Sequence, residues 1–281
     1  MIKENYNVEQ TGSANDAKFL LIKLGGNALI KESALFSFSS AINQLVNSGY
    51  RLIITHGGGP QITAALENAG IESRFVDGFR YTSSAAIKIV KDLLCGEIQN
   101  EIISSLRKSG GKNITAICGD EGVIRAEIKT KNASNKDVDL GYVGDVSGVH
   151  TAKIISALDA GCIVVLSAIG KNEDGTLLNI NADSAAAALA AALKVDELIL
   201  LTDVDGVFSK WPDKNSLISE LTLDQALELM PNLAAGMLPK LEAAITALKS
   251  GVPKVRILNG SDGEALLISQ SNNASIGTVI S

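Results

Sequence analysis

Five short runs of leucine and β-branched residues recur along the chain, each bounded by glycine, aspartate or other polar residues. Their length and their continuous apolar character are typical of strands that are buried on both faces of a parallel sheet. The predicted strands are Lys18–Leu24, Arg51–Thr55, Asn113–Cys118, Cys162–Ala168 and Glu197–Thr202.

The segments between and after these runs are long enough for helices and carry apolar residues at helical spacing. The predicted helices are Ala34–Ser48, Pro60–Ala69, Ser84–Lys108, Thr151–Ala160, Ser184–Leu193, Leu223–Leu229 and Leu238–Lys249. Strands that alternate with helices in this way predict an α/β protein with a mostly parallel sheet covered on both faces.

One segment departs from this alternation. From Val123 to Val146 the sequence becomes polar and alternating, which predicts a hairpin on the surface. The polar turn Gly170–Gly175 predicts a soft boundary within one continuous domain. We therefore expect a short polar leader over residues 1–17, an amino-terminal lobe over 18–170 and a carboxyl-terminal lobe over 171–281.

Composition limits which partners the protein can bind and in which cellular compartment we expect it. The net charge of −6 leaves no broad basic surface for nucleic acid. The amino-terminal segment has no apolar core of a signal peptide, and no run of about 18 apolar residues occurs, so we expect neither secretion nor a membrane span. Three widely spaced cysteines, Cys95, Cys118 and Cys162, favour reduced thiols and a cytoplasmic protein.

Two glycine-rich turns follow predicted strands. They are Lys23–Asn27, with a lysine just before its glycines, and His56–Gln61. In open α/β sheets ligands bind at the carboxyl ends of strands, and glycine lets backbone N–H groups approach an anion closely. Neither turn matches a standard nucleotide fingerprint, since Ile62 stands where a third glycine is expected. The turns indicate an anion site, and the alternative is tight packing.

Four further features are informative only together. Arg80 has the planar fork that grips carboxylates, although loop arginines are often merely solvated. Leu198–Phe208 carries a strand into a Thr-Asp-x-Asp-Gly turn that could simply cap the next element. Lys240 lies near a helix start, where a cation is unfavourable unless an anion is close. The polar entrance Asn179–Asp183 precedes an alanine-rich helix, and its simplest interpretation is capping.

Six motifs occur in a fixed order: Lys-x-Gly-Gly (23–26), His-Gly-Gly-Gly-Pro (56–60), Gly-Phe-Arg-x-Thr (78–82), Asn-x-Asn-Ala-Asp (179–183), Leu-Thr-Asp-Val-x-Gly-Val (201–207) and Gly-Met-x-x-Lys (236–240). The set resembles the amino acid kinase family and, within it, the branch that phosphorylates N-acetylglutamate. The likeness covers about residues 18–281. It implies a three-layer α/β/α sandwich with a central, mostly parallel open sheet, whose amino-terminal half binds the acetylamino acid and forms a dimer.

The resemblance also implies a reaction. The γ-phosphoryl group of ATP, bound with Mg²⁺ by the carboxyl-terminal half, would pass to the γ-carboxylate of N-acetyl-L-glutamate. The products would be N-acetyl-L-glutamyl 5-phosphate and ADP, in the second step of arginine biosynthesis. Such an acceptor is already ionised at neutral pH and needs no general base, which fits a chain with only two histidines. What the reaction needs is relief from anionic repulsion.

Roles follow by position in the motifs. Lys23 and Lys240 would stabilise the transferring phosphoryl group, and Asp183 would hold these lysines. The substrate-binding residues implied are Gly58, Gly59, Arg80 and Asn179, the last two on the α-carboxylate. The ATP-binding residues implied are Gly25, Gly26, Asp203, Val204, Asp205, Gly206, Val207, Phe208, Asn232, Leu233 and Ala234. No side chain is assigned as a metal ligand, and the role of Asn181 stays open between the substrate and the turn.

The chain departs from the family pattern at two positions. Asp120 stands where many members have lysine, and Ala235 replaces the first glycine of Gly-Gly-Met. Members inhibited by arginine carry an amino-terminal helix and a glutamate in the closing segment. Here the leader is short and polar, and residues 266–278 contain no acidic residue. The resemblance therefore implies a homodimer that is insensitive to arginine.

Other functions fit the sequence less well. Sister kinases that act on acetylaminoadipate or carbamate share the fold, and a non-catalytic sensor would need neither lysine nor Asp183. An aspartokinase would carry a regulatory domain after the kinase region, which here runs to Ser281. The chain lacks the G-x-G-x-x-G motif that a NAD-dependent dehydrogenase would carry.

Overall fold

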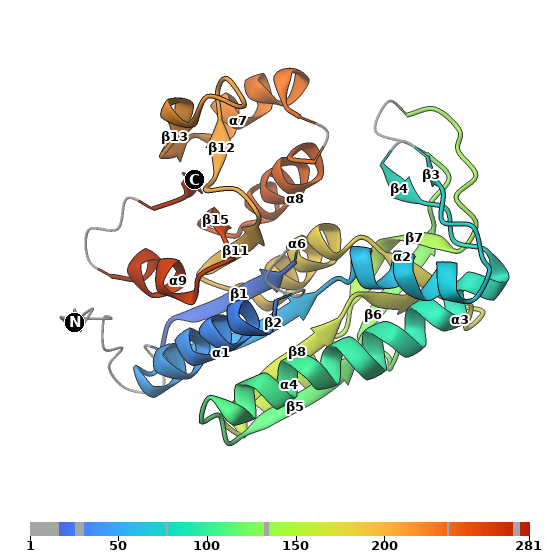
Figure 1. The fold of residues 1–281 in the computed structure, drawn as a ribbon, viewed down its shortest axis with the longest axis horizontal. Coiled ribbons are helices and arrows are strands. Elements are labelled where there is room, and N and C mark those ends of the chain that lie inside the picture. Colours follow the sequence, from blue (N-terminus) through green and yellow to red (C-terminus); the bar gives the residue numbers. More distant parts are fainter. Residues whose placement is uncertain (1–16, 26–30, 77, 132–134, 235, 272–275) are drawn as a thin grey trace.

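The computed structural model describes residues 17–25, 31–76, 78–131, 135–234, 236–271 and 276–281. An eight-stranded sheet lies at its centre, in the order β14-β16-β15-β11-β1-β2-β8-β5 (Figure 1). The parallel strands are β15 (Val255–Asn259), β11 (Glu197–Thr202), β1 (Phe19–Leu24), β2 (Arg51–His56), β8 (Ile163–Ser167) and β5 (Ile114–Cys118). At one edge β16 (Thr278–Ile280) runs antiparallel to β15 and is followed by β14 (Glu220–Leu221).

Helices cover both faces of this sheet. One face carries α1 (Glu32–Asn47), α2 (Gly59–Asn68), α3 (Ser84–Asp92), α4 (Gln99–Lys108) and α9 (Gly263–Ser269). The other carries α5 (Ala152–Asp159), α6 (Ala182–Leu193), α7 (Leu223–Leu229) and α8 (Leu238–Lys249). The predicted three-layer α/β/α sandwich with a mostly parallel open sheet is confirmed.

The alternation of side chains along β1 decides which residues meet which helices. Leu20 and Ile22 belong to the core beneath α1, whereas Leu21 belongs to the core beneath α6. Because successive side chains of a strand point to opposite faces, Lys23 shares the face of Leu21. The strand thus points Lys23, one residue before its end, toward α6, the helix that begins within the Asn179–Asp183 motif.

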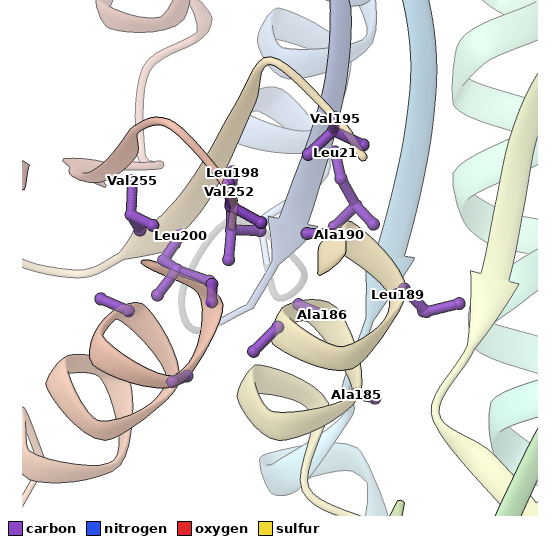
Figure 2. Close-up of a cluster of buried hydrophobic side chains, with 14 of the residues drawn as sticks. Leu21, Ala185, Ala186, Leu189, Ala190, Val195, Leu198, Leu200, Val252 and Val255 are labelled. Carbon is purple, nitrogen blue, oxygen red and sulfur yellow. The ribbon is translucent and has the colours of Figure 1, made fainter. Parts of the chain in front are cut away.

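The alanines of α6 allow close packing. Ala185, Ala186, Ala187 and Ala190 are each at most 1% exposed. Figure 2 shows the helix beside Leu21 of β1, together with leucine and valine side chains of the same buried cluster. Small side chains let α6 lie near both the sheet and α8, which fixes the position of its amino-terminal end.

The segment predicted as a surface hairpin has a larger role. Strands β6 (Ile124–Ile128) and β7 (Val143–Val149) pair antiparallel as expected, but they close with β9 (Ile169–Lys171) and β10 (Leu177–Ile180) into a small four-stranded barrel. The turn at Gly175 joins β9 to β10 within this barrel. The division into lobes at residues 170–171 stays a prediction.

Several elements were not predicted. The run Ser84–Lys108 is helical throughout, but a π-helical turn, η2 (Leu93–Ile98), separates α3 from α4. Strands β14, β15 and β16 and helix α9 complete the carboxyl-terminal part. Short pairs and turns are β3 (Phe75–Val76), β4 (Phe79–Arg80), β12 (Val207–Phe208), β13 (Leu217–Ile218), η3 (Lys214–Ser216) and η4 (Met230–Asn232).

The expectation of three reduced thiols is wrong for two of them. Cys95 and Cys118 form a disulfide, and Cys162 is free. The helix through η2 passes over the end of β5 and joins two cysteines that are 23 residues apart, a proximity that spacing alone does not show. Over the described ranges, no helix has the length and apolarity to cross a membrane.

Candidate active site

The motifs meet at one edge of the sheet. Because the six central strands are parallel, their carboxyl ends share this edge. From β1 the chain proceeds to β2 on one side, and it returns later to β11 on the other side of β1. Such a change of direction leaves a crevice in which α/β proteins bind ligands.

A bridge of three charged side chains lies in this crevice. Lys23 Nζ is 2.9 Å from Asp183 Oδ1, and Lys240 Nζ is 3.3 Å from Asp183 Oδ2. Lys23 is the penultimate residue of β1, Asp183 lies in the first turn of α6, and Lys240 lies in the first turn of α8. One carboxylate therefore holds two ammonium groups from distant parts of the sequence.

The bridge carries a net positive charge in a dry setting. Asp183 is 5% exposed and Lys23 6%. Burial raises the pKa of Asp183, but the charges of Lys23 and Lys240 outweigh this effect and hold the pKa below its ordinary value. With two cations and one anion, the cluster attracts a further negative charge.

A cavity of about 220 Å³ opens on the Lys23 side of the bridge. Lys23, Gly25 and Asp183 contribute to its wall, together with the turn Gly57–Gly59. Two helices begin there, α2 at Gly59 and α6 at Ala182, and helix amino ends favour anions. Both predicted glycines, Gly58 and Gly59, thus lie where a small anionic ligand would bind.

Arg80 also lines this smaller cavity and is 8% exposed. Its Nη2 donates to the Gly59 carbonyl at 2.8 Å and to Thr63 Oγ1 at 2.8 Å, and its Nη1 donates to Ser73 Oγ. The guanidinium carbon lies 4.7 Å from the centre of the Phe75 ring. Burial lowers the pKa of Arg80 from its ordinary value. These contacts fix the guanidinium plane and favour its pairing with a carboxylate.

The two asparagines of the entrance motif make different hydrogen bonds. Asn181 is the N-cap of α6, because its Oδ1 accepts from the Asp183 and Ser184 N–H groups at 2.9 and 3.0 Å. The role in the turn, one of the two left open for Asn181 from the sequence, is therefore present in the structure, and Asp183 is left to hold the two lysines. Asn179 Nδ2 instead donates to Thr82 Oγ1 at 3.2 Å, and both asparagines line the smaller cavity with Arg80.

A larger cavity, about 560 Å³, opens on the Lys240 side of the bridge. Five predicted ATP-binding residues line it: Asp203, Val204, Phe208, Leu233 and Ala234. They come from the end of β11, from β12 and from the approach to α8. The two cavities therefore lie on either side of one carboxylate.

Other predicted nucleotide residues lie elsewhere. Gly25 borders the smaller cavity. Asp205 accepts a hydrogen bond from Asn259 Nδ2 at 2.8 Å, and the Val207 N–H donates to Thr278 Oγ1 at 2.8 Å. Gly206, between them, has a φ of +158° and packs against Thr278. None of these three residues is on the wall of the larger cavity as far as the described chain goes. Gly26 and the side chain of Asn232 lie outside the described residues.

Sequence reasoning missed part of both walls. Trp211, Lys210 and Met237 line the larger cavity, and Phe75 and Leu94 line the smaller one. Trp211 is 54% exposed, and its ring lies 5.2 Å from that of Phe208 in an edge-to-face arrangement. The signal available in the sequence was a single tryptophan within a polar loop.

His56 precedes the glycine turn and is hydrogen-bonded to its first residue. It is fully buried, and its Nδ1 is 3.1 Å from the Gly57 carbonyl, which can only accept, so Nδ1 carries the proton. Its Nε2 has no hydrogen-bond partner among the described residues. Burial lowers the pKa of His56 to about 4, although the Gly57 hydrogen bond acts in the opposite direction. The imidazole is therefore neutral at physiological pH.

We expect this buried imidazole to make the fold acid-sensitive. An unfolded histidine has a pKa of about 6.5. Between that pH and about 4 the unfolded chain binds a proton that the folded chain does not, so stability falls as the pH falls. At about 1.4 kcal/mol per unit, the loss reaches about 3 kcal/mol, of which about 2 occurs by pH 5. Denaturant unfolding at about pH 7.5 and pH 5 measures it, and His56→Gln should lose less over the same interval. Equal losses would contradict the assignment.

Comparisons with known proteins agree with this geometry. Residues 18–259 match the model of the amino acid kinase family. An acetylglutamate kinase of Nocardioides is 36% identical over 94% of this chain and 84% of its own length. One from Corynebacterium jeikeium is 37% identical over 94% and 83%.

Solved structures resemble the chain as well. An N-acetylglutamate synthase of Neisseria gonorrhoeae superposes with a TM-score of 0.81 and 25% identity, and the chain covers 59% of that protein's length. A carbamate kinase of Giardia superposes with a TM-score of 0.68 and 20% identity over 98% of its length. The second likeness shows the fold alone.

Proposed function

The chain belongs to the amino acid kinase family, and from that premise we propose that it transfers the γ-phosphoryl group of ATP to the γ-carboxylate of N-acetyl-L-glutamate. The relatives named acetylglutamate kinase support this choice of acceptor, since they match over most of the chain. The products would be N-acetyl-L-glutamyl 5-phosphate and ADP, as in the second step of arginine biosynthesis.

The observation that carries the proposal is the bridge Lys23–Asp183–Lys240 between the two cavities. Lys23 and Asp183 line the smaller cavity, and Lys240 lines the larger one. A donor in the larger cavity and an acceptor in the smaller one would meet at two ammonium groups. Phosphoryl transfer between two anions requires positive charge at that point.

The residues present can perform the reaction without a general base. The acceptor carboxylate, with a side-chain pKa near 4, is already a nucleophile at neutral pH. Arg80 and Asn179 would hold its α-carboxylate, and the amides of the Gly57–Gly59 turn would face the reacting end. Lys23 and Lys240 would stabilise charge on the transferring group, and Asp183 would keep both ammonium groups in position.

The larger cavity also fits a magnesium nucleotide. Both oxygens of Asp183 are paired with lysines, so that carboxylate is not a free metal ligand. Asp203 supplies the carboxylate among the described residues that line the larger cavity. Mg²⁺ bound by one or two carboxylates and by phosphate oxygens would neutralise part of the phosphate charge. Among the described residues of this cavity, Asp203 is thus suited to hold the ion.

A direct assay tests the proposal. ATP, Mg²⁺, N-acetylglutamate and hydroxylamine should give an acyl hydroxamate and ADP, because hydroxylamine traps an acyl phosphate. Acetylaminoadipate and carbamate, the acceptors of sister kinases, should react poorly. Preference for either one would assign the chain to that sister activity. Absence of ADP release with all three acceptors would leave a non-catalytic sensor.

Arg80→Lys should weaken binding of the acetylamino acid. A lysine offers a point charge in place of the planar fork and cannot keep the contacts with Gly59 and Thr63. We expect the KM for N-acetylglutamate to rise by about tenfold, the loss of roughly 1.4 kcal/mol, while the KM for ATP changes little. Arg107→Lys, an exposed arginine of α4, is the matched control. Equal changes in both KM values would remove Arg80 from the acceptor site.

Tryptophan fluorescence should report nucleotide binding. Trp211 is the single tryptophan of the chain and lines the larger cavity, where a purine base can stack on aromatic rings. We expect MgADP to change the emission in a saturable way and N-acetylglutamate alone to leave it nearly unchanged. Inorganic pyrophosphate is the control for phosphate contacts without a base. A response to pyrophosphate equal to that of MgADP would place the base away from Trp211.

Assembly, regulation and location belong to the same proposal. We propose that the protein is a cytoplasmic homodimer that arginine does not inhibit. Sedimentation checks the dimer, and a hexamer would exclude it. Inhibition by millimolar arginine would exclude the insensitivity.

A further inference from the structure

The Cys95–Cys118 disulfide lies at the same sheet edge as the glycine turn. Cys118 ends β5, and its neighbour in register is Ser167 at the end of β8. Ser167 is in turn the register neighbour of His56, which precedes the turn Gly57–Gly59. The Ser167 Oγ is 3.1 Å from Cys95 Sγ and 3.5 Å from Cys118 Sγ. The sulfur pair is thus two strands away from the turn.

The other half of the pair, Cys95, belongs to the helical turn that packs on Gly58. Cys95 lies in the π-helical turn η2, between Leu94 and Gly96. Leu94 and Ile98, from the same turn, pack so closely on Gly58 that a Cβ there would overlap Ile98. Leu94 also lines the smaller cavity. Any shift of η2 would therefore move the backbone that faces the acceptor.

The conformation of η2 depends on tertiary contacts. A π-helical turn is rare, occurs mostly as a single turn inserted in an α-helix and is frequent at functional sites. The disulfide attaches this turn to the end of β5 and fixes it against the sheet. Reduction would remove that attachment and leave η2 free to relax away from Gly58.

A metal site is the competing interpretation, because ligand atoms of Cys95, Cys118 and Asp120 lie within 4.8 Å of one another. Asp120 is 4% exposed, and its Oδ2 is 2.9 Å from Lys91 Nζ and 3.2 Å from Lys171 Nζ. Two ammonium groups on this carboxylate oppose the arrival of a further cation. The sulfur atoms are moreover bonded to each other. The observations favour redox chemistry.

We propose that Cys95 and Cys118 form a reversible dithiol–disulfide site that sets the affinity of the acceptor cavity, the disulfide being the high-affinity form. The inference rests on the proposed function for the identity of the acceptor. It adds a regulatory input that the phosphoryl transfer itself does not require.

The exposure of the two sulfurs sets the order of events. Cys95 is half-buried and Cys118 is 6% exposed. The Cys95 thiolate would attack an external disulfide such as oxidised glutathione and release one glutathione thiol. The Cys118 thiolate would then displace the second. One S–S bond forms in the protein and one breaks in glutathione, while two protein thiols lose two protons and two electrons.

The experiment uses the Cys162→Ser protein, in which this pair holds the remaining cysteines. The protein is equilibrated in buffers of defined reduced-to-oxidised glutathione ratio, quenched with acid, alkylated and weighed by mass spectrometry. We expect one transition between two free thiols and none. The reduced form should have a KM for N-acetylglutamate raised roughly fivefold or more, with kcat and the KM for ATP little changed.

A reciprocal measurement needs no turnover. Saturating N-acetylglutamate should shift the glutathione ratio at the midpoint toward more reducing conditions, by the same factor as the affinity change. In the Cys95→Ser, Cys162→Ser variant, which lacks the attacking thiol and keeps Cys118 at 6% exposure, the KM should be the same in both buffers. This variant shows whether glutathione itself affects the enzyme.

Three results would overturn the proposal: equal KM values in the two redox states, two free thiols persisting in oxidised glutathione, or one equivalent of Zn²⁺ that protects both thiols from alkylation. Failure of the proposed function looks different. In that case neither redox state phosphorylates N-acetylglutamate. If the enzyme is active but its KM values are equal in the two redox states, the proposed function stands and only the redox control is excluded.

Discussion

Lys240→Ala is expected to lower kcat by roughly 10²- to 10³-fold, the range for losing one group that acts on developing charge. Lys240 is near both Asp183 and the larger cavity, so its ammonium group can follow the phosphoryl group during transfer. Because charge on that group is redistributed most in the transition state, the KM for N-acetylglutamate should change much less. Steady-state kinetics with each substrate varied in turn gives both quantities.

Lys249→Ala provides the matched control for this variant. Lys249 ends the same helix, α8, and is exposed, so its replacement removes the same charge without touching the bridge. We expect its kcat to stay within about twofold of the parent. An unchanged kcat in Lys240→Ala would remove this lysine from the mechanism. A large rise in KM alone would make it a binding group.

Asp183→Asn is expected to damage both activity and stability. An amide of the same shape leaves Lys23 and Lys240 without their shared anion, and their ammonium groups then repel each other in a buried setting. We expect a loss of unfolding free energy on the order of 3 kcal/mol near neutral pH. The kcat should fall by roughly 10²-fold or more, because neither ammonium group keeps its position. Denaturant unfolding and steady-state kinetics measure the two effects.

The pH dependence of the unfolding free energy shows whether Asp183→Asn destabilises the fold through lost charge or lost packing. The pKa of Asp183 is lowered in the fold, so its ion pairs contribute stability above the unfolded-state value of about 3.9, and that contribution is lost as the pH falls further. The stability difference between the parent and Asp183→Asn should therefore shrink below about pH 4. Asp174→Asn, in an exposed turn, should show no such difference. A deficit that persists unchanged into acid would indicate lost packing instead of lost charge.

The entrance motif shows how far sequence reasoning reached. Polar residues before an alanine-rich helix indicated capping plus a charged site, and the structure contains both. Which residue caps was not decided, since Asn179, Asn181 and Asp183 all have side chains suited to it. The backbone resolved the choice, because only Asn181 is placed to accept from the N–H groups of the first turn.

The nucleotide side shows a different limit. The turn after β11 was recognised as a unit, yet Asp203 and Val204 line the larger cavity whereas Asp205 faces Asn259. Neighbours in a tight turn point in different directions, so a motif does not tell which of its members face the ligand. Trp211 was missed for the converse reason, since an isolated aromatic residue has no periodic pattern.

By itself the sequence determined the alternation of strands and helices, the burial of the sheet on both faces and the glycine turns at strand ends, because these depend on local periodicity and backbone freedom. The family resemblance implied that Asp183 holds Lys23 and Lys240, and the tertiary structure gives the two ion pairs. Tertiary structure alone decided that the predicted hairpin closes into a barrel and that Cys95 meets Cys118. These are contacts between residues distant in the chain. Their distances depend on strand order and helix placement, which no local pattern specifies.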